Sequence, residues 1–190
     1  MLLTALPLQE TSEAQRSELA AELDVDGIRQ YVIGRDFVVG RPPAESIAWR
    51  TERDLAGETM HLMVFVDEIP IGWAGWTPYV GNEVETTTYL VPAAWGTGIN
   101  PQLKALQWQV CVMAGRRLVI TTSADNERSQ AAVRKLWPGC PEEQIWAPAV
   151  NRYNTAFHVE GPPLGYQPWP DDIVEHCATA VRAIPAAEHV

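Results

Sequence analysis

The segment EVETTTYLVPAAWGTGIN, residues 83–100, constrains the fold more than any other stretch of this chain. Its first half predicts a strand, because β-branched residues dominate it and its side chains alternate between two faces. Pro92 ends that strand, since proline has no N–H to donate to a sheet. Gly96 and Gly98 then form a tight loop, and Pro101 stands near the start of a helical pattern. A strand that leads through a glycine loop into a helix presents free backbone N–H groups, which suit a phosphate or pyrophosphate.

A second strand and helix follow the first pair. Arg117–Thr122 predicts a buried strand, and Glu127–Leu136 predicts a helix capped by Asp125 or Asn126. The two strands of such a unit are parallel and joined by a right-handed crossover. An antiparallel hairpin, Met60–Val66 with Pro70–Trp76, precedes them. We therefore expect a mixed α/β fold, with a mostly antiparallel sheet that contains a central parallel pair and is flanked by helices.

The rest of the chain supplies weaker elements, and residues 1–190 are expected to form a single domain. From about residue 137 the chain is rich in Trp and Pro, and this part could form a lid or a dimer contact in a homodimer. The other expected elements are a strand within Leu2–Leu8, helices at Ser12–Leu23, Asp24–Phe37 and Ala44–Leu55, strands near Gln144–Ala147 and Thr155–Glu160, and a final helix at Asp171–Ile184.

Charge and composition exclude some classes of function. A formal net charge of −10 argues against a nucleic-acid partner, which calls for a basic face. The same charge is compatible with a cationic or amine-bearing substrate. Many proteins, however, carry a negative net charge for solubility alone. No apolar run approaches the roughly 20 residues of a membrane span.

The cysteines and the first residues indicate a compartment. Cys111, Cys140 and Cys177 are too few and too scattered for a disulfide framework or a zinc site. The opening MLLTALPLQE has no basic region, so a secretory signal is not expected. We expect a reducing, cytoplasmic location.

Two segments resemble the GNAT (Gcn5-related N-acetyltransferase) superfamily, TYLVPAAWGTGINPQLKALQ and TTSADNERSQAAVRKL. The first is similar to the acyl-CoA loop of the family, and the second to the strand and loop that carry Asn-x-x-Ser on the next helix. Within the family, the sequence is most similar to the branch that includes the ribosomal-protein N-terminal acetyltransferases. The resemblance covers about residues 60–136. It implies a parallel strand pair that splays apart at the acyl-CoA site.

The resemblance also implies an activity: transfer of an acyl group, most simply acetyl from acetyl-CoA, to a primary amine by direct attack. The acceptor would be a small molecule or a peptide amine, and no metal is implied. In this reading the residues 95–98 bind the pyrophosphate, and backbone N–H groups near the end of the strand polarise the thioester. The implied acyl-CoA-binding residues are Leu90, Val91, Trp95, Gly96, Thr97, Gly98, Ile99, Asn100, Asn126 and Ser129.

Acyl transfer to an amine needs a base and a proton source for the departing thiolate. Glu83 and Glu85 share one face of the strand, and a buried carboxylate there could take the proton of the amine. Glu85 lies nearer the expected splay and is the first choice, although a solvated pair of carboxylates has the same pattern. Ser129 is the candidate proton source. His61 and His158 are alternatives, but a lone histidine on a strand is more often structural.

Two departures from the family favour another interpretation. Ala93 stands where the family usually carries Gln or Arg, and Val133 stands where many members carry the tyrosine that protonates the thiolate. A GNAT-fold protein that binds acyl-CoA without catalysis, or that acts as an interaction partner, is therefore the alternative. A nucleotide-binding loop is weaker, because GTGINP lacks the third glycine of a dinucleotide loop and the Gly-Lys-Ser/Thr of a P-loop.

Some side chains have two interpretations. Trp73, Trp76 and Tyr89 suit either the core or the wall of an acceptor pocket. Lys104 lies on the predicted helix, where lysines are usually solvated, and is therefore not expected in the site.

Overall fold

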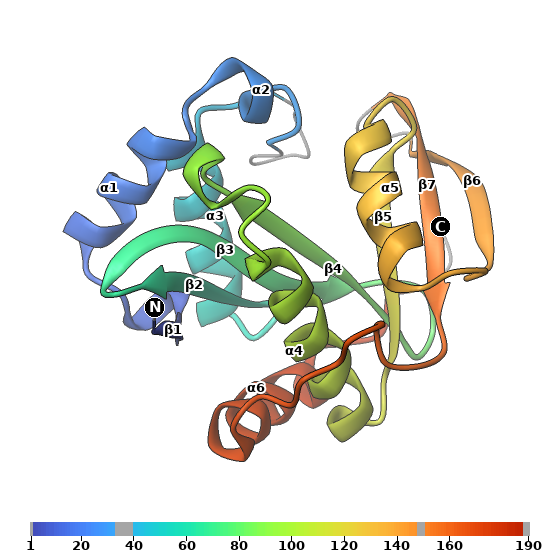
Figure 1. Cartoon of the computed structure of the whole chain (residues 1–190). Coiled ribbons are helices and arrows are strands. Elements are labelled where there is room, and N and C mark those ends of the chain that lie inside the picture. The colour runs from blue at the N-terminus through green and yellow to red at the C-terminus, as the bar shows by residue number, and fades with distance from the viewer. Residues whose placement is uncertain (1, 33–39, 148–150, 188–190) are drawn as a thin grey trace.

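The computed structural model describes residues 2–32, 40–147 and 151–187. Within these ranges the strands form a seven-stranded sheet in the order β1-β2-β3-β4-β5-β7-β6 (Figure 1). All neighbouring strands are antiparallel except β4 and β5, which are parallel. The expected mixed sheet with a central parallel pair is confirmed. The strands are β1 Leu3–Pro7, β2 Met60–Val66, β3 Ile69–Pro78, β4 Glu83–Leu90, β5 Arg117–Ser123, β6 Glu142–Ala147 and β7 Arg152–Val159.

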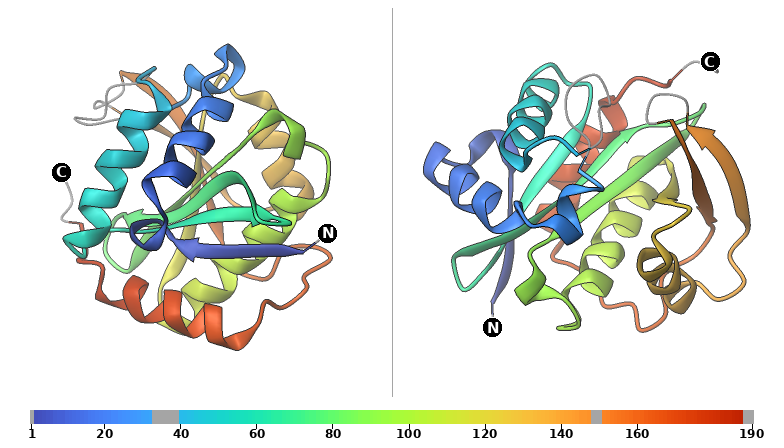
Figure 2. Two further views of the ribbon diagram at one scale, coloured as in Figure 1. Left: turned by 90° about the vertical axis from the view of Figure 1, so that its left-hand side faces the viewer. Right: turned by 90° about the horizontal axis from the view of Figure 1, so that it is seen from above.

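The helices cover both faces of this sheet (Figure 2). On one face Arg50 of α3 contacts the His61 ring of β2, and on the other the carbonyl of Gln107 in α4 accepts a hydrogen bond from Trp76 of β3. α1 packs beside α3, and α6 packs beside α4. The helices are α1 Glu13–Leu23, α2 Asp26–Arg29, α3 Pro43–Leu55, α4 Ile99–Ala114, α5 Glu127–Leu136 and α6 Asp171–Ala183, with short 3-10 turns η1 Leu8–Glu10 and η3 Pro92–Ala94.

The N-terminal helices match the sequence expectations unevenly. α1 begins with a capping box in which Ser12 Oγ accepts from the Gln15 N–H and Gln15 Oε1 accepts from the Ser12 N–H. In place of the helix expected over residues 24–37, the structure has one short helix, α2. The helix ends there because the chain reverses direction at Gln30 and Tyr31. Its expected continuation over residues 33–37 lies outside the described residues.

The parallel strands separate before either of them ends. Their pairing runs from Glu83–Arg117 to Thr86–Ile120. Beyond that point β4 continues to Leu90, while β5 continues to Ser123 and pairs only with β7. The sheet therefore opens between the last four residues of β4 and the last three of β5, which is the expected splay.

Two apolar clusters lie on either side of the sheet. One contains Leu106, Phe157 and Val174 among residues of α4, α5 and α6, and the other contains Leu19 among residues under α1 and α3. Trp73 and Trp76 have no exposed surface, so both belong to the core and neither forms an acceptor wall.

Two of the three tryptophans in the Trp- and Pro-rich part, Trp137 and Trp169, pack on their own chain, whereas Trp146 is exposed. Trp169 donates its backbone N–H to Gln109 Oε1 at 2.9 Å and its indole N–H to the Gln102 carbonyl at 2.8 Å, so it lies along α4. Trp137 is buried and donates to the Gly161 carbonyl at 2.7 Å. Among the described residues, no helix combines the length and the apolar character that crossing a membrane requires.

Candidate active site

The glycine loop turns tightly at the end of β4 and starts α4. Gly96 and Gly98 have φ angles of 77° and 85°, in the left-handed region that favours glycine, and Gly98 is the N-cap of the helix. Trp95, Gly96, Thr97 and Gly98 are exposed. The N–H groups of residues 96–98 donate no hydrogen bond to any other described residue. Unpaired N–H groups at the start of a 16-residue helix are suited to an anion.

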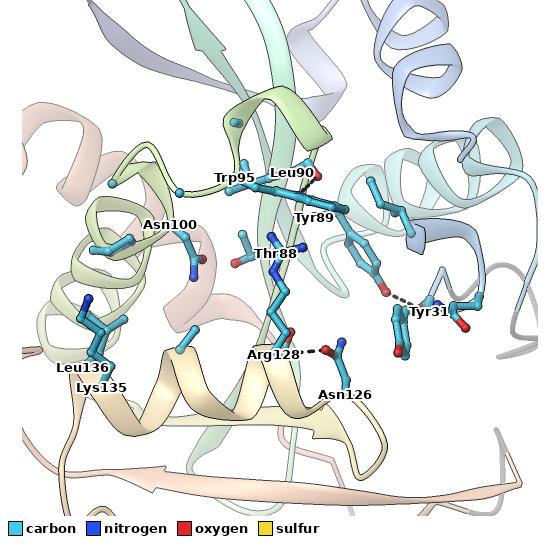
Figure 3. Close-up of a pocket in the computed structure, with 18 residues that line it drawn as sticks. Tyr31, Thr88, Tyr89, Leu90, Trp95, Asn100, Asn126, Arg128, Lys135 and Leu136 are labelled. Atoms are coloured by element: carbon cyan, nitrogen blue, oxygen red, sulfur yellow. Dashed lines mark hydrogen bonds between the residues drawn. The ribbon is translucent and has the colours of Figure 1, made fainter. Parts of the chain in front are cut away.

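A cavity of about 580 Å³ lies between this loop and α5 (Figure 3). Seven of the predicted acyl-CoA-binding residues line it: Leu90, Trp95, Gly96, Gly98, Asn100, Asn126 and Ser129. The position of Asn126 is fixed by its helix, because its side-chain oxygen caps α5 by accepting from the Ser129 N–H at 3.1 Å.

The other three predicted binding residues do not line the cavity. Val91 and Ile99 are buried in the core, and the Val91 N–H donates to the Ile71 carbonyl at 2.9 Å. That amide is therefore occupied by the sheet and is not free to polarise a thioester. The Thr97 hydroxyl donates to the Ala94 carbonyl at 2.7 Å, which stabilises the loop itself.

Arg128 is a cavity residue that the sequence did not single out. Its guanidinium carbon lies 3.7 Å from the centroid of the Trp95 ring, and Figure 3 shows the side chain extending from α5 toward that ring. Trp95 is held in turn by a hydrogen bond of 2.8 Å from its indole N–H to the Leu90 carbonyl. The stacked pair places a cation beside the glycine loop, where phosphate groups would lie.

A second cavity of about 160 Å³ occupies the opening between β4 and β5. It shares Thr88, Tyr89, Asn126 and Ser129 with the first cavity, so the two adjoin. The Tyr89 hydroxyl donates to the Tyr31 carbonyl at 2.7 Å, which ties the end of β4 to the turn after α2. A molecule that binds along α5 in the larger cavity can therefore extend into the sheet opening.

Glu85 lines this smaller cavity, as expected of the base. Removal from bulk water raises the pKa of Glu85, and the hydrogen bond from the Thr121 hydroxyl and the charges of Arg50 and Lys104 offset only part of that rise. Glu83 lines neither cavity: its carboxylate lies 3.1 Å from Arg117 Nη2 and 3.5 Å from His158 Nδ1. The structure thus separates the two candidate carboxylates and leaves Glu85 in the cavity.

Lys104 corrects the sequence expectation. It is 6% exposed and lines the smaller cavity, because α4 packs directly on the sheet. Its Nζ donates to Thr88 Oγ1 at 3.1 Å and to Gln107 Oε1 at 2.9 Å. Burial lowers the pKa of Lys104 to about 7, and the Glu85 carboxylate opposes that shift. The cavity therefore holds a carboxylate whose pKa is raised by burial and an amine whose pKa is lowered by burial.

A buried network lies behind the site on the α3 side. The Asp54 carboxylate accepts from the Thr59 hydroxyl at 2.6 Å and from His61 Nδ1 at 2.8 Å, while Arg50 Nη1 lies 2.8 Å from His61 Nε2. Burial lowers the pKa of His61, which leaves the ring neutral, with the proton on Nδ1 and Nε2 accepting from Arg50. Gly75 makes room for the ring, since a Cβ there would lie 2.1 Å from His61 Cδ2. His61 is thus structural, as the sequence favoured.

A sheet that opens between its parallel strands, beside a glycine loop at the N-terminus of the crossover helix, is the arrangement that the resemblance implies for an acyltransferase. Comparison with known proteins defines the family. A family profile described as "Acetyltransferase (GNAT) domain" matches residues 8–136. The chain therefore belongs to the GNAT acetyltransferase family, and it is an N-acetyltransferase. A search of curated proteins finds no match.

Solved structures share the fold at low identity. An aminoglycoside acetyltransferase AAC(6')-Ib in complex with coenzyme A superposes with a TM-score of 0.61 and 13% identity, over 83% of this chain and 95% of that chain. A spermidine N-acetyltransferase from Vibrio cholerae gives 0.56 and 12%, over 83% and 92%. A ribosomal-protein-S5-alanine acetyltransferase from Vibrio fischeri gives 0.54 and 12%, over 87% and 96%. At these identities the likeness establishes the fold alone.

Proposed function

We propose that this N-acetyltransferase moves an acetyl group from acetyl-CoA to a primary amine by direct attack in the opening between β4 and β5. The observation that carries the proposal is that Glu85 lines a cavity in the opening of the sheet that adjoins the larger cavity along α5. The attacking nitrogen forms the new N–C bond, the C–S bond breaks, and the amine proton passes to the Glu85 carboxylate.

The residues around the larger cavity fit coenzyme A. The free N–H groups of the glycine loop, together with Arg128, would hold the phosphates, and Asn126 would bind the pantetheine arm. The thiolate takes up a proton as it leaves. Ser129 remains the candidate proton source, and Lys104 is a second one, because it lies in the smaller cavity with its pKa lowered to about 7. With either residue as the proton source, the thiolate can be protonated without the tyrosine that Val133 replaces.

Location and assembly are part of the same proposal. We place the enzyme in a reducing, cytoplasmic compartment, because Cys111, Cys140 and Cys177 are all free thiols. Residues 1–190 would act as one domain, since α6 packs against α4 and the tail before it is bonded to that helix. The acceptor would be a small-molecule or peptide amine.

Two measurements in sequence test the proposal. Thermal melting with acetyl-CoA, CoA, NAD and ATP should show a selective shift with the two coenzyme A species. Thiol release with acetyl-CoA and a panel of primary amines should then show turnover that depends on the amine. A shift with NAD or ATP instead would contradict the assigned ligand, and binding of acetyl-CoA without thiol release for any amine would contradict catalysis.

A further inference from the structure

The smaller cavity collects most of the unpaired buried polar atoms. Among the described residues, seven buried side-chain nitrogen or oxygen atoms have no hydrogen-bond partner, and five of them belong to residues that line this cavity. A buried polar group left unpaired costs about 1–3 kcal/mol, so the cavity favours a polar occupant over an apolar one. The five atoms are Thr86 Oγ1, Thr87 Oγ1, Thr122 Oγ1, Arg152 Nε and Asn154 Oδ1.

Arg152 is the most informative member of this set. Its Nε is buried without a hydrogen bond, and no carboxylate of the described residues forms an ion pair with its guanidinium. The chain has 24 acidic residues and only 14 Lys and Arg, so a carboxylate partner is not scarce. An arginine left without one beside a polar cavity is suited to an anion from outside, and its planar fork matches a carboxylate.

The strand register places Arg152 on the same side of the sheet as Glu85. Ser123 pairs with Asn154, so both side chains point to one face, and Arg152, two residues before Asn154 on β7, points to that face as well. Glu85 pairs with Val119, which shares its face with Thr121 and Ser123 by the same alternation. α4, which follows the glycine loop, packs on the opposite face through Lys104 and Thr88. Arg152 is therefore on the side from which an acceptor would approach, away from the phosphate loop.

We propose that the acceptor is a zwitterion of the amino-acid type, whose amine lies at Glu85 and whose carboxylate binds Arg152 in the smaller cavity. This inference rests on the proposed acetyl transfer. Opposite charges on the protein then match opposite charges on the substrate: the Glu85 carboxylate receives the amine, and the unpaired guanidinium receives the carboxylate. Asn154 Oδ1 and Thr87 Oγ1, which lies on the Glu85 face of β4, complete the hydrogen bonds of a small polar molecule. The alternative occupant is water, for which 160 Å³ is room for about five molecules.

Acceptor pairs that differ only in the carboxylate test the proposal on the unmodified enzyme. β-Alanine and propylamine are one such pair, and 1,3-diaminopropane replaces the carboxylate with a second cation. With acetyl-CoA present, kcat/KM for thiol release should be at least about tenfold higher for β-alanine than for the other two. In the presence of CoA, β-alanine should raise the melting temperature and propylamine should not. Equal rates, equal shifts, no shift for either, or a preference for the diamine would overturn the proposal.

Arg152→Gln assigns the effect to this residue. It should raise the KM for β-alanine about tenfold or more, change kcat by less than about twofold, and leave propylamine kinetics unchanged. Arg152→Lys should restore part of the loss. Arg41→Gln removes a half-exposed arginine that pairs with Glu45 on the surface and should change neither substrate. If Arg152→Gln weakens both acceptors equally, or neither, the carboxylate is bound elsewhere and the proposal fails.

Two further results separate this inference from the proposed function. If acetyl-CoA binds but no amine gives thiol release, acetyl transfer fails, while the melting shift with β-alanine still tests the carboxylate site. If succinyl-CoA is preferred over acetyl-CoA and the preference is lost in Arg152→Gln, the guanidinium binds the acyl donor. That result would overturn the acceptor assignment and leave acyl transfer intact.

Discussion

Lys104 Nζ donates to Thr88 Oγ1 across a distance of 3.1 Å, which joins the crossover helix α4 to β4 where the sheet opens. The lysine is buried at the point where the sequence pattern predicted a solvated residue. Its lowered pKa, about 7, means that it is partly neutral in the folded protein near neutral pH, although the unfolded chain holds the proton up to about pH 10.5. This difference makes the stability of the protein depend on pH.

Lys104→Met is expected to raise the free energy of unfolding at pH 7, because it removes a buried cation, and the gain should shrink as the pH rises. Between about pH 7 and pH 10.5 the unfolded wild type binds more protons than the folded state, so wild-type stability rises with pH in that window. The difference in free energy of unfolding between Lys104→Met and the wild type should fall by up to about 3 kcal/mol between pH 7 and about pH 9.5. Urea unfolding at both pH values measures it. Lys135→Met, which removes an exposed lysine, should show no such trend, and parallel wild-type and Lys104→Met curves would show that the buried lysine titrates normally.

Glu85→Gln is expected to lower kcat for thiol release by about 100-fold or more, because the amide cannot accept the proton of the amine. The carboxylate must be ionised to act, so wild-type kcat/KM should fall as the pH falls through a pKa above 4.5, in line with the raised pKa of Glu85. Glu83→Gln serves as the comparison and should keep that pH dependence, because its carboxylate lies against Arg117 and His158 outside both cavities. If the fall of kcat/KM at low pH is lost in Glu83→Gln and kept in Glu85→Gln, the base is Glu83 and not Glu85.

Arg128→Gln is expected to raise the Kd for CoA about tenfold, because it removes the cation that stacks on Trp95 beside the glycine loop. The dependence of the Kd on salt should weaken at the same time. Isothermal titration calorimetry at two salt concentrations measures both effects. Arg134→Gln is the matched control on the same helix: Arg134 is bound to Glu142 at 2.7 Å and lines neither cavity, so the Kd should not change. Equal effects of the two variants would place the phosphates elsewhere.

Gly98→Ala is expected to lower the free energy of unfolding by about 1–2 kcal/mol, because an alanine at a φ of 85° is strained although the space around it is open. Gly161→Ala adds the same methyl group to open space at an ordinary φ and should change stability by less than about 0.5 kcal/mol. Urea unfolding compares the two. A cost at Gly161 that equals the cost at Gly98 would exclude backbone strain as the cause.

Local patterns predicted most of the elements around the site. The bounds of α5 are those expected, and the strand before the glycine loop ends at Leu90, one residue short of the end at Val91 that Pro92 indicated. The order strand, helix, strand predicted that β4 and β5 are parallel. α4 begins at Ile99, two residues before the proline from which its start was expected, because Gly98 provides the N-cap. These features depend on neighbours in sequence, which is why a single sequence could indicate them.

The sequence by itself thus determined the strand, the glycine loop and the helix, since backbone conformation and alternating polarity are local properties. Only the tertiary structure decided which charged groups share a cavity. Lys104 has the pattern of a solvated helix residue, and it is buried because α4 lies flat on the sheet. Arg152 comes beside the opening because β7 pairs with β5, a contact between residues about 30 positions apart that no local pattern specifies. The chemistry of the site follows from desolvation and charge proximity, and both arise only when distant segments pack together.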